Sequence, residues 1–413
     1  MKPNNFPERL VWYSIIYTYG FYLVGGLYLV YPAIAWILVL YLCNKLWKQT
    51  EETPEDEKIT IPWLTWLWIG GMLIELLALV MGHLDFQLGD KMTIKSSIGW
   101  ARSWALLAVF PLVSCLKIRS QLVYRAVCIL CLQTLFLAPI LYLAPVLKIN
   151  PLVYTSPLQY LGGGGELFFR INLYMGGDRL VFFAPWAPAI GLVGNVYFFI
   201  ALQEKKQKWR WCGLIGSFLM CYFSKSRMAT LYLPIVFLSV FILTKLTKHF
   251  FLIMAGFIAA IAGMTAPEII DAATVYWHNL RSSRAGSTRV RDVLASIVLE
   301  RWTESPIWGH GVVERGPKLV EFMKIGTHNT YLSLLFVKGI VGLIAFVIPL
   351  ASSFIFLLIK AQKSSIGQLG LSMVLILFLY GLGANLESIA YLYWPGLFLL
   401  GKAFQVEDSG LES

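Results

Sequence analysis

The sequence is poor in charge. Only 14% of its 413 residues are Asp, Glu, Lys or Arg, whereas soluble proteins have about 25%. Hydrophobic residues make up 58%, and the mean hydropathy is +0.67. These values exclude an ordinary soluble domain. They predict an all-α, polytopic transmembrane helix bundle that forms a single integral membrane domain over residues 1–413.

Metal, nucleotide and nucleophile motifs are also missing. No Asp-x-Asp pair, P-loop, Gly-x-Gly-x-x-Gly or Ser-His-Asp set is evident, and the histidines have no ligand spacing. Cys128 and Cys131 have the spacing of a Cys-x-x-Cys pair, but they lie in an apolar run with no second pair. We interpret them as small apolar residues of a membrane span. The sequence therefore predicts no metal and no cofactor.

The net charge of +11 raises the question of a nucleic-acid partner. RNP-like motifs, zinc spacings and basic helices are absent. Much of the positive excess lies in short connections between apolar runs, where the positive-inside bias explains it. We therefore expect the lipid bilayer, and no nucleic acid, as a partner.

Apolar runs predict about twelve spans, because a helix needs roughly 20 apolar residues to cross a bilayer. Gly25-Gly26 and Pro32 favour a hairpin between the first two spans, and no cleavage site follows the first run, so we expect it to be retained. The predicted spans are 11–30, 32–47, 62–84, 97–115, 121–146, 182–203, 209–224, 226–244, 249–266, 330–360, 367–384 and 389–405.

The distribution of Lys and Arg among the short connections predicts that both termini are cytoplasmic. Two longer segments then lie on the outer side: a smaller loop at 147–181 and a main loop at 267–327, which we expect to contain amphipathic helices. The tail 405–413 reads as disordered. The main loop is rich in arginine although it lies on the side that the insertion rule disfavours for positive charge, which suggests a functional reason for the charge.

The main loop holds a candidate anion site. Apolar residues recur near a 3.6-residue period and predict a helix over Val290–Glu304, lying on the membrane surface with its apolar face down. Arg289 and Arg291 would then lie in its first turn, beside N–H groups that attract anions, and Arg284 precedes them. This arrangement suits a diphosphate. The alternative is an interfacial helix whose arginines meet lipid headgroups.

Other polar residues cluster at the predicted outer face. His328 follows Thr327, a good N-cap, and would lie at the membrane edge, where an imidazole can move a proton or simply stack on Tyr331. Arg227 and Arg179 each stand at the outer start of a span, so three connections bring arginines to one face. Glu75 and Arg102 lie inside neighbouring spans, where isolated charges are costly, and we expect them to pair.

In combination, three motifs resemble those of a known family. They are Ser226-Arg227 at a span start, Arg291 followed by Pro306-x-x-Gly309-x-Gly311, and Thr327-His328-Asn329-x-Tyr331-Leu332. With about twelve spans, their order and spacing resemble the O-antigen ligase / O-antigen polymerase superfamily of bacterial envelope glycosyltransferases. Arg289 competes with Arg291 as the arginine of the second motif.

The resemblance implies an enzyme of the bacterial inner membrane with a periplasmic active site. It implies metal-independent, inverting glycosyl transfer from an undecaprenyl-diphosphate-linked glycan to a glycan or lipid A-core acceptor. Carried over to this sequence, the catalytic residues are His328, Arg291 and Arg227. Contacts to the diphosphate or glycan are expected from Arg289, Arg179, Arg284, Asn329 and Tyr331.

Three other interpretations remain open. A polymerase would join lipid-linked repeat units, and it tends to present two sizeable outer loops; the larger size of 267–327 favours a ligase slightly. A transporter or flippase of lipid-linked glycan would show polar residues along a path through the spans, where this sequence has few. A non-catalytic assembly protein would not need the cationic motifs.

Overall fold

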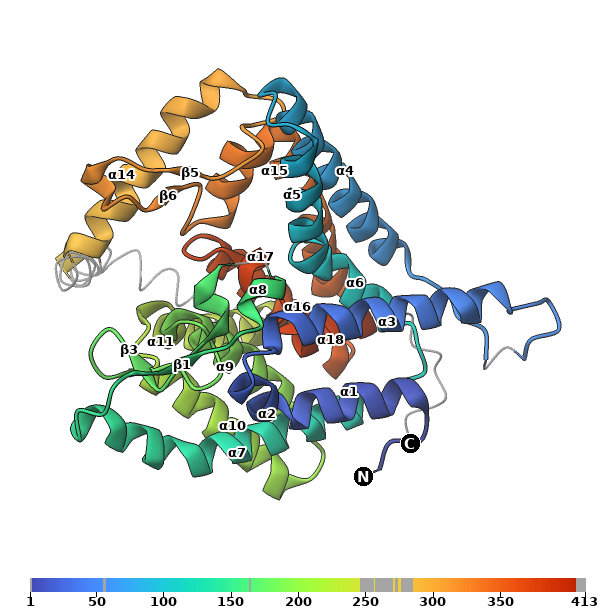
Figure 1. Cartoon of the computed structure of the whole chain (residues 1–413). Helices are drawn as coiled ribbons and strands as arrows, with labels where there is room; N and C mark the ends of the chain where they lie inside the picture. Colours follow the sequence, from blue (N-terminus) through green and yellow to red (C-terminus); the bar gives the residue numbers. More distant parts are fainter. Residues whose placement is uncertain are drawn as a thin grey trace.

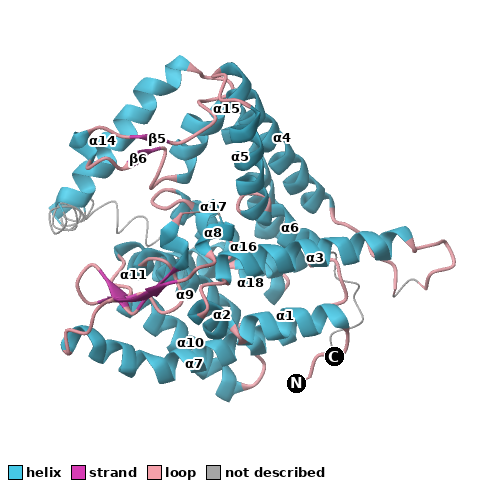
Figure 2. Ribbon diagram, in the orientation of Figure 1, coloured by secondary structure: helices cyan, strands magenta, loops and turns pink. Residues whose placement is uncertain are grey.

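The computed structural model describes residues 2–54, 57–162, 165–245 and 285–405, with five isolated positions between 246 and 284. Helices dominate these parts, and the few strands are short (Figures 1 and 2). The predicted span 249–266, the first part of the main loop with Arg284, and most of the tail lie outside the described residues.

The helices follow the apolar runs of the sequence, with breaks at several predicted spans. Their bounds are α1 Phe6–Ile16, α2 Thr18–Leu23, α3 Leu27–Trp47, α4 Trp63–Asp85, α5 Asp90–Arg102, α6 Leu106–Val113, α7 Ser120–Val146, α8 Gln159–Gly162, α9 Ala187–Leu202, α10 Gln207–Phe223, α11 Arg227–Leu243, α14 Ala285–Arg301, α15 Thr330–Lys360, α16 Ser365–Gly381, α17 Leu386–Ile389 and α18 Trp394–Phe404. The mainly helical fold that composition predicts is confirmed.

Four of the described helices, α3, α4, α7 and α15, are long and apolar enough to cross a membrane. The pair α5 and α6, bent by 41° at its break, makes a fifth if it counts as one span. Helices α9, α11 and α16 are apolar but shorter. Four to five candidate spans are therefore present among the described residues, and the total of about twelve stays a prediction.

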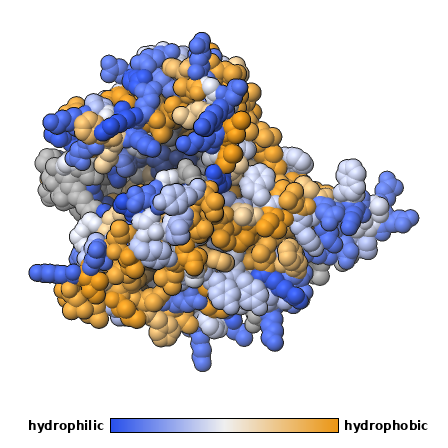
Figure 3. Space-filling view, viewed as in Figure 1, coloured by the Kyte–Doolittle hydropathy of each residue, from blue (hydrophilic) through white to orange (hydrophobic). Residues whose placement is uncertain are grey.

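The surface of the protein carries extensive apolar area. Large hydrophobic side chains such as Leu77 on α4 and Phe136 on α7 are more than half exposed. Figure 3 shows hydrophobic residues over wide parts of the visible face, while hydrophilic residues gather in the region of α14, β5 and β6. Exposed apolar area of this extent is unusual for a soluble monomer, and it suits a protein surrounded by lipid.

The expected turn between the first two apolar runs is present. The chain reverses at Val24–Gly26, where Gly25 has φ +68°. A Cβ on Gly25 would lie 2.3 Å from the Cβ of Ser156, so a larger residue would clash with the outer segment packed there. Before the turn, the predicted span 11–30 is divided into α1 and α2.

Two chain ends meet at one side of the bundle. Near the N-terminus, the Asn5 side chain donates to the Lys117 carbonyl. At the end of α18, Gln405 donates to the Ser114 carbonyl and accepts from Lys360 at the end of α15. Since α15 ends at this side, its first residue, Thr330, lies at the opposite side. The arrangement agrees with termini on one side, while the identity of that side stays a prediction.

Short antiparallel pairs occur in the two segments that the sequence predicts to lie outside. In 147–181, β1 (Leu152–Thr155) pairs with β2 (Arg170–Asn172), and β3 (Tyr174–Met175) pairs with β4 (Arg179–Leu180). In the main loop, β5 (Glu314–Arg315) pairs with β6 (Lys324–Ile325). Figure 1 shows α14, β5 and β6 together beside the start of α15.

Helix α14 confirms the expected helix of the main loop but differs from it in position. It has begun by Ala285, and its buried face, Val290, Leu294 and Val298, packs against residues of the same loop and of α15. The apolar face is thus covered by protein, so the expectation that this face points down into the membrane is wrong, while the position of the helix at the membrane surface stays a prediction. The reason is that β5, β6 and the start of α15 supply a closer apolar surface, including Phe336.

Candidate active site

Helix α15 is broken, and the Pro306-x-x-Gly309-x-Gly311 segment fits the break. Gly339 has φ +63° and ψ −164°, so the helical hydrogen bonds around it cannot form. The segment supplies substitutes: His310 N–H donates to the Phe336 carbonyl at 2.8 Å, and Ile340 N–H donates to the Pro306 carbonyl at 2.9 Å. Backbone groups freed at membrane depth need such partners, because lipid offers none.

Glycine is required at both positions of this segment. A Cβ on Gly309, which has φ +68°, would lie 2.5 Å from the backbone nitrogens of Lys338 and Gly339. A Cβ on Gly311, which has φ +73°, would lie 2.9 Å from the ring of His83 and close to the backbone of α4. The segment therefore lies backbone to backbone between α4 and α15, and its role in the described structure is structural.

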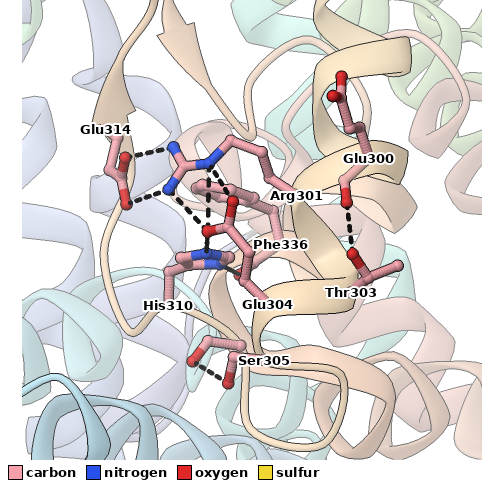
Figure 4. A network of polar contacts seen from close by, with 9 residues as sticks. Glu300, Arg301, Thr303, Glu304, Ser305, His310, Glu314 and Phe336 are labelled. Carbon is pink, nitrogen blue, oxygen red and sulfur yellow. Dashed lines mark hydrogen bonds and ion pairs between the residues drawn. The ribbon is translucent and has the colours of Figure 1, made fainter.

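A polar network fixes the same segment from the other side (Figure 4). Arg301, at the end of α14, pairs with Glu304 at 3.0 Å and with Glu314 at 2.5 Å. Glu304 also bonds the Nε2 of His310 at 2.9 Å, and the His310 ring stacks on Phe336 with 4.3 Å between centroids. The hydrogen bonds from Arg301 and His310 lower the pKa of Glu304 to about 2.

His328 lies at a corner just before α15. Its φ is +69°, a left-handed conformation uncommon outside glycine and found often at functional sites. Its backbone N–H donates to the side chain of Asn385 at 2.5 Å. The N-cap of α15 is Asn329, which accepts from Leu332 N–H, so the expected cap Thr327 is wrong by two residues. An Asn amide oxygen caps as well as a Thr hydroxyl, and the sequence offered both.

The neighbours of His328 hold this corner against the connection that follows α16. Asn329 donates to the Leu382 carbonyl at 3.2 Å, and Thr330 donates to the Ala384 carbonyl at 2.7 Å. Tyr331 donates to the Phe378 carbonyl at 3.1 Å. In the structure the polar atoms of Asn329 and Tyr331 thus bond to the protein backbone. Their expected contacts with substrate stay predictions.

Arg227 begins α11 at the same end of the bundle. The neighbouring residue, Met228, packs against Gly383, in the connection that bonds Asn329. The other end of α11 confirms this placement, because the Leu243 carbonyl accepts from Gln362, two residues past the end of α15. Arg227 therefore begins its helix on the side where α15 also begins.

Arg179 reaches the same place from the smaller outer segment. Its Nε donates to the carbonyl of Ser224 at 3.0 Å, two residues before Ser226. Beside it, Asp178 forms an ion pair with Lys225. Two of the outer connections predicted to bring arginines together, at 178–179 and 224–227, are therefore in contact.

Arg291, on α14, is within electrostatic range of two of these elements. Its charge acts on the ring of His328 and on the hydroxyl of Tyr232, which is five residues past Arg227 on α11. Burial and this charge lower the pKa of His328 below the ordinary value of 6.5, so the imidazole is neutral near pH 7. Arg291 is half-buried whereas Arg289 is exposed, which favours Arg291 of the two competing arginines.

One part of the expected anion site is wrong. Because α14 has begun by Ala285, Arg289 and Arg291 lie beyond its first turn and not beside its first N–H groups. Electrostatic support from a helix N-terminus falls off within one turn. The positive charge that this site offers to an anion therefore comes from guanidinium groups and not from a helix N-terminus.

Two residues of this region, Asn385 and Glu387, were not predicted from the sequence. Asn385 accepts from His328 and donates to the Glu387 carboxylate at 2.9 Å. Burial raises the pKa of Glu387. The sequence does carry a signal, because Asn385 and Glu387 are polar residues in a short connection between two apolar runs, close to the predicted outer face.

A buried ion pair lies deeper in the bundle than the corner. The ammonium of Lys338 on α15 lies 2.9 Å from the carboxylate of Glu75 on α4. A pair of opposite charges inside the bundle is what the cost of isolated charge predicts. The expected partner, Arg102, is wrong, because α15 supplies the cation that neutralises Glu75.

Comparison with known proteins places these motifs in a family. No curated protein matches the chain. Residues 212–347, from α10 to the middle of α15, match the family model described as O-antigen ligase. This segment contains Arg227, Arg291 and His328, and the match confirms the resemblance to the O-antigen ligase / O-antigen polymerase superfamily.

Proposed function

We propose that this protein transfers a glycan from an undecaprenyl-diphosphate carrier to an acceptor hydroxyl at the periplasmic face of the bacterial inner membrane. The family match supports an enzyme of polysaccharide assembly. The observation that carries the finer proposal is that Arg227 at the start of α11 and His328 just before α15 lie at the same end of the bundle, where Arg179 also bonds Ser224.

The chemistry needs charge stabilisation more than acid catalysis. The acceptor oxygen attacks the anomeric carbon, the bond from that carbon to the diphosphate breaks, and the lipid diphosphate leaves with the electron pair. Configuration at the carbon inverts. Arg227 and Arg291 stabilise the negative charge that grows on the diphosphate, an effect typically worth about 10²–10³ in rate for one donor.

His328 takes the proton of the acceptor hydroxyl in this mechanism. A lowered pKa leaves its imidazole neutral near pH 7, which is the form that accepts a proton. No hydrogen bond to its ring nitrogens is found among the described residues. General base catalysis of this kind contributes about 10²–10⁴ in rate.

A first experiment tests the three residues together. Arg227→Ala, Arg291→Ala and His328→Ala are each expected to abolish glycan transfer in cells lacking the native gene, while the protein still reaches the membrane in normal amount. Lys318→Ala is the matched control, because Lys318 is an exposed cation of the same outer loop. Normal surface glycan in all three variants would reject the proposal.

A second experiment separates ligase from polymerase. Deletion of a ligase leaves polymerised glycan on the carrier lipid, whereas deletion of a polymerase leaves single repeat units, and the two give different patterns on a gel of cell glycans. We favour the ligase, with lipid A-core or another glycan as acceptor. A flippase is less well supported, because the charges Glu75 and Lys338 inside the spans neutralise each other.

A further inference from the structure

A cavity of about 250 Å³ lies next to the His328 corner, and no arginine is among the described residues that line it. Residues of α4, α5, the 311–313 segment, α15 and α17 line it. Its polar lining comes from Ser96, Ser333, Lys338 and Glu387, and its aromatic lining from Trp100 and Trp104. The volume is below the 300–1,000 Å³ or so of pockets for drug-sized ligands, so it suits a ligand of about one sugar ring.

Two hydrogen bonds connect this cavity to His328. Glu387 lines the cavity and accepts from the Asn385 side chain at 2.9 Å, and Asn385 accepts from His328 N–H at 2.5 Å. Asn385 also reaches the hydroxyl of Ser333, another lining residue, at 3.5 Å. A ligand held by Glu387 would therefore be connected to the backbone of His328, the residue that is proposed to accept the proton, through two hydrogen bonds.

The lining contains a polar atom whose hydrogen-bonding capacity is unused. The Oε2 of Glu387 is buried and has no hydrogen-bond partner among the described residues. Buried polar groups are nearly always satisfied, so such an atom calls for an explanation. The hydroxyl group of a ligand would supply the missing partner once the carboxylate turns this oxygen toward the cavity, since a hydroxyl donates to a carboxylate oxygen and can also accept from a neighbouring donor.

The charge of the cavity lining favours a neutral sugar over a phosphate group as the ligand. The cation of the lining, Lys338, is already paired with Glu75 at 2.9 Å. Among the lining residues Glu387 adds only a carboxylate, so the cavity offers no uncompensated positive charge to an anion. The guanidinium of Arg291, by contrast, acts on the imidazole of His328. The cavity and the surroundings of Arg291 thus suit different chemistry.

We propose that this cavity binds the sugar ring of the acceptor, as a neutral, hydroxyl-rich pyranose whose nucleophilic hydroxyl points to His328. This assignment rests on the proposed function and adds to it a place for the acceptor. Trp100 and Trp104 contribute apolar lining against which the C–H face of the ring can pack, and one face of Trp104 already carries the Lys338 ammonium, 4.1 Å from the ring centroid. Glu387 and the serine hydroxyls bond its hydroxyl groups.

Binding can be measured without knowledge of the natural acceptor. The probes are a panel of methyl glycosides of hexoses, N-acetylhexosamines and 6-deoxyhexoses, followed by saturation-transfer NMR on the full chain in nanodiscs. Inorganic diphosphate, followed by calorimetry, reports on the arginine side. We expect at least one glycoside to bind the wild-type protein saturably and diphosphate to bind independently of it.

Two variants test the cavity in different ways. Glu387→Gln keeps the shape of the side chain and removes its charge. Val313→Phe fills the cavity from an exposed edge position and leaves the buried charges in place. Both should weaken glycoside binding about tenfold or more, as expected when a charged hydrogen bond or the space itself is lost, and both should keep diphosphate binding. Arg291→Ala should do the reverse, and Glu300→Gln, an exposed carboxylate on α14, should change neither.

Glycoside binding that survives both cavity variants, or no saturable binding by any member of the panel up to its solubility limit, would overturn the assignment. If one of the two cavity variants no longer elutes as a single species in size-exclusion chromatography, the other variant decides the test, because it alters the cavity by a different substitution. The two proposals fail separately. Normal glycan in the Arg227, Arg291 and His328 variants would reject the transferase while glycoside binding could still assign the cavity.

Discussion

The break in α15 makes a sharp prediction about Gly309. In the Gly309→Ala variant the new Cβ would lie 2.5 Å from the backbone nitrogens of Lys338 and Gly339. These are main-chain atoms, so no side-chain rotation relieves the contact. The residue also has φ +68°, a conformation that costs a residue with a Cβ about 1–2 kcal/mol.

The expected loss combines both terms. Forcing a backbone shift by overpacking costs about 1–3 kcal/mol, so together with the conformational term the variant should lose about 2–5 kcal/mol of unfolding free energy. It should also reduce glycan transfer, because the segment that it displaces supports the start of α15, where His328 and Asn329 lie.

The assay is unfolding of the purified protein by SDS in mixed micelles, together with transfer activity in cells. Gly70→Ala is the matched control, since Gly70 lies inside α4 and a Cβ added there would have no atom within 4 Å. Alanine at this position should be neutral or stabilise by about 0.5–1 kcal/mol. A Gly309→Ala protein as stable as the Gly70→Ala protein would refute the account of the Pro306–Gly311 segment.

Two further substitutions and a pH profile test the contacts of the site. Lys338→Met leaves the Glu75 carboxylate unpaired inside the bundle and should cost about 3–5 kcal/mol, whereas the double variant with Glu75→Gln should regain much of that loss in the same SDS assay. Because the pKa of His328 lies below 6.5, transfer should hold at pH 7 and decline only as the pH falls through the lowered pKa and the imidazole becomes protonated; a pH–rate profile that already declines above 6.5 would contradict this. Arg179→Ala removes the hydrogen bond to Ser224 and should lower transfer by about tenfold, the worth of one such bond to a charged group, while Asp178→Asn, in an exposed ion pair, should change it little.

Local patterns in the sequence predicted the helices well. The apolar runs at 62–84, 121–146 and 330–360 became α4, α7 and α15 with ends within two residues, because length and hydrophobicity are properties of the segment itself. The turn at Gly25 was also predicted from its residues. The break at Gly339 was not, because a glycine in an apolar run fits a continuous helix equally well.

Contacts between distant segments were harder to predict. The pairing of Glu75 with Lys338 depends on which helices are neighbours, and the sequence suggested only that charges inside spans pair. Asn385 lies 57 residues beyond His328, to which its side chain bonds, and nothing in the local pattern connects them. Helix α14 was expected on the membrane because its apolar face was known while the protein surface that covers it, including Val320 and Ile325, was not.

The residues of the family motifs are of two kinds, which differ in whether their polar atoms bond to the protein itself. In Pro306-x-x-Gly309-x-Gly311 the backbone closes the break of α15, and in the segment after Thr327 the amide of Asn329 and the hydroxyl of Tyr331 bond backbone carbonyls. Such residues fix geometry, because their polar atoms are already used by the protein. The imidazole of His328 differs, since its backbone holds the corner while its ring is left for chemistry. Asn385 holds the backbone of this corner and also bonds the Glu387 carboxylate, while the charge of Arg291 acts on the ring, and the proposed catalyst, which would join an anionic donor to a neutral acceptor, needs both kinds of group.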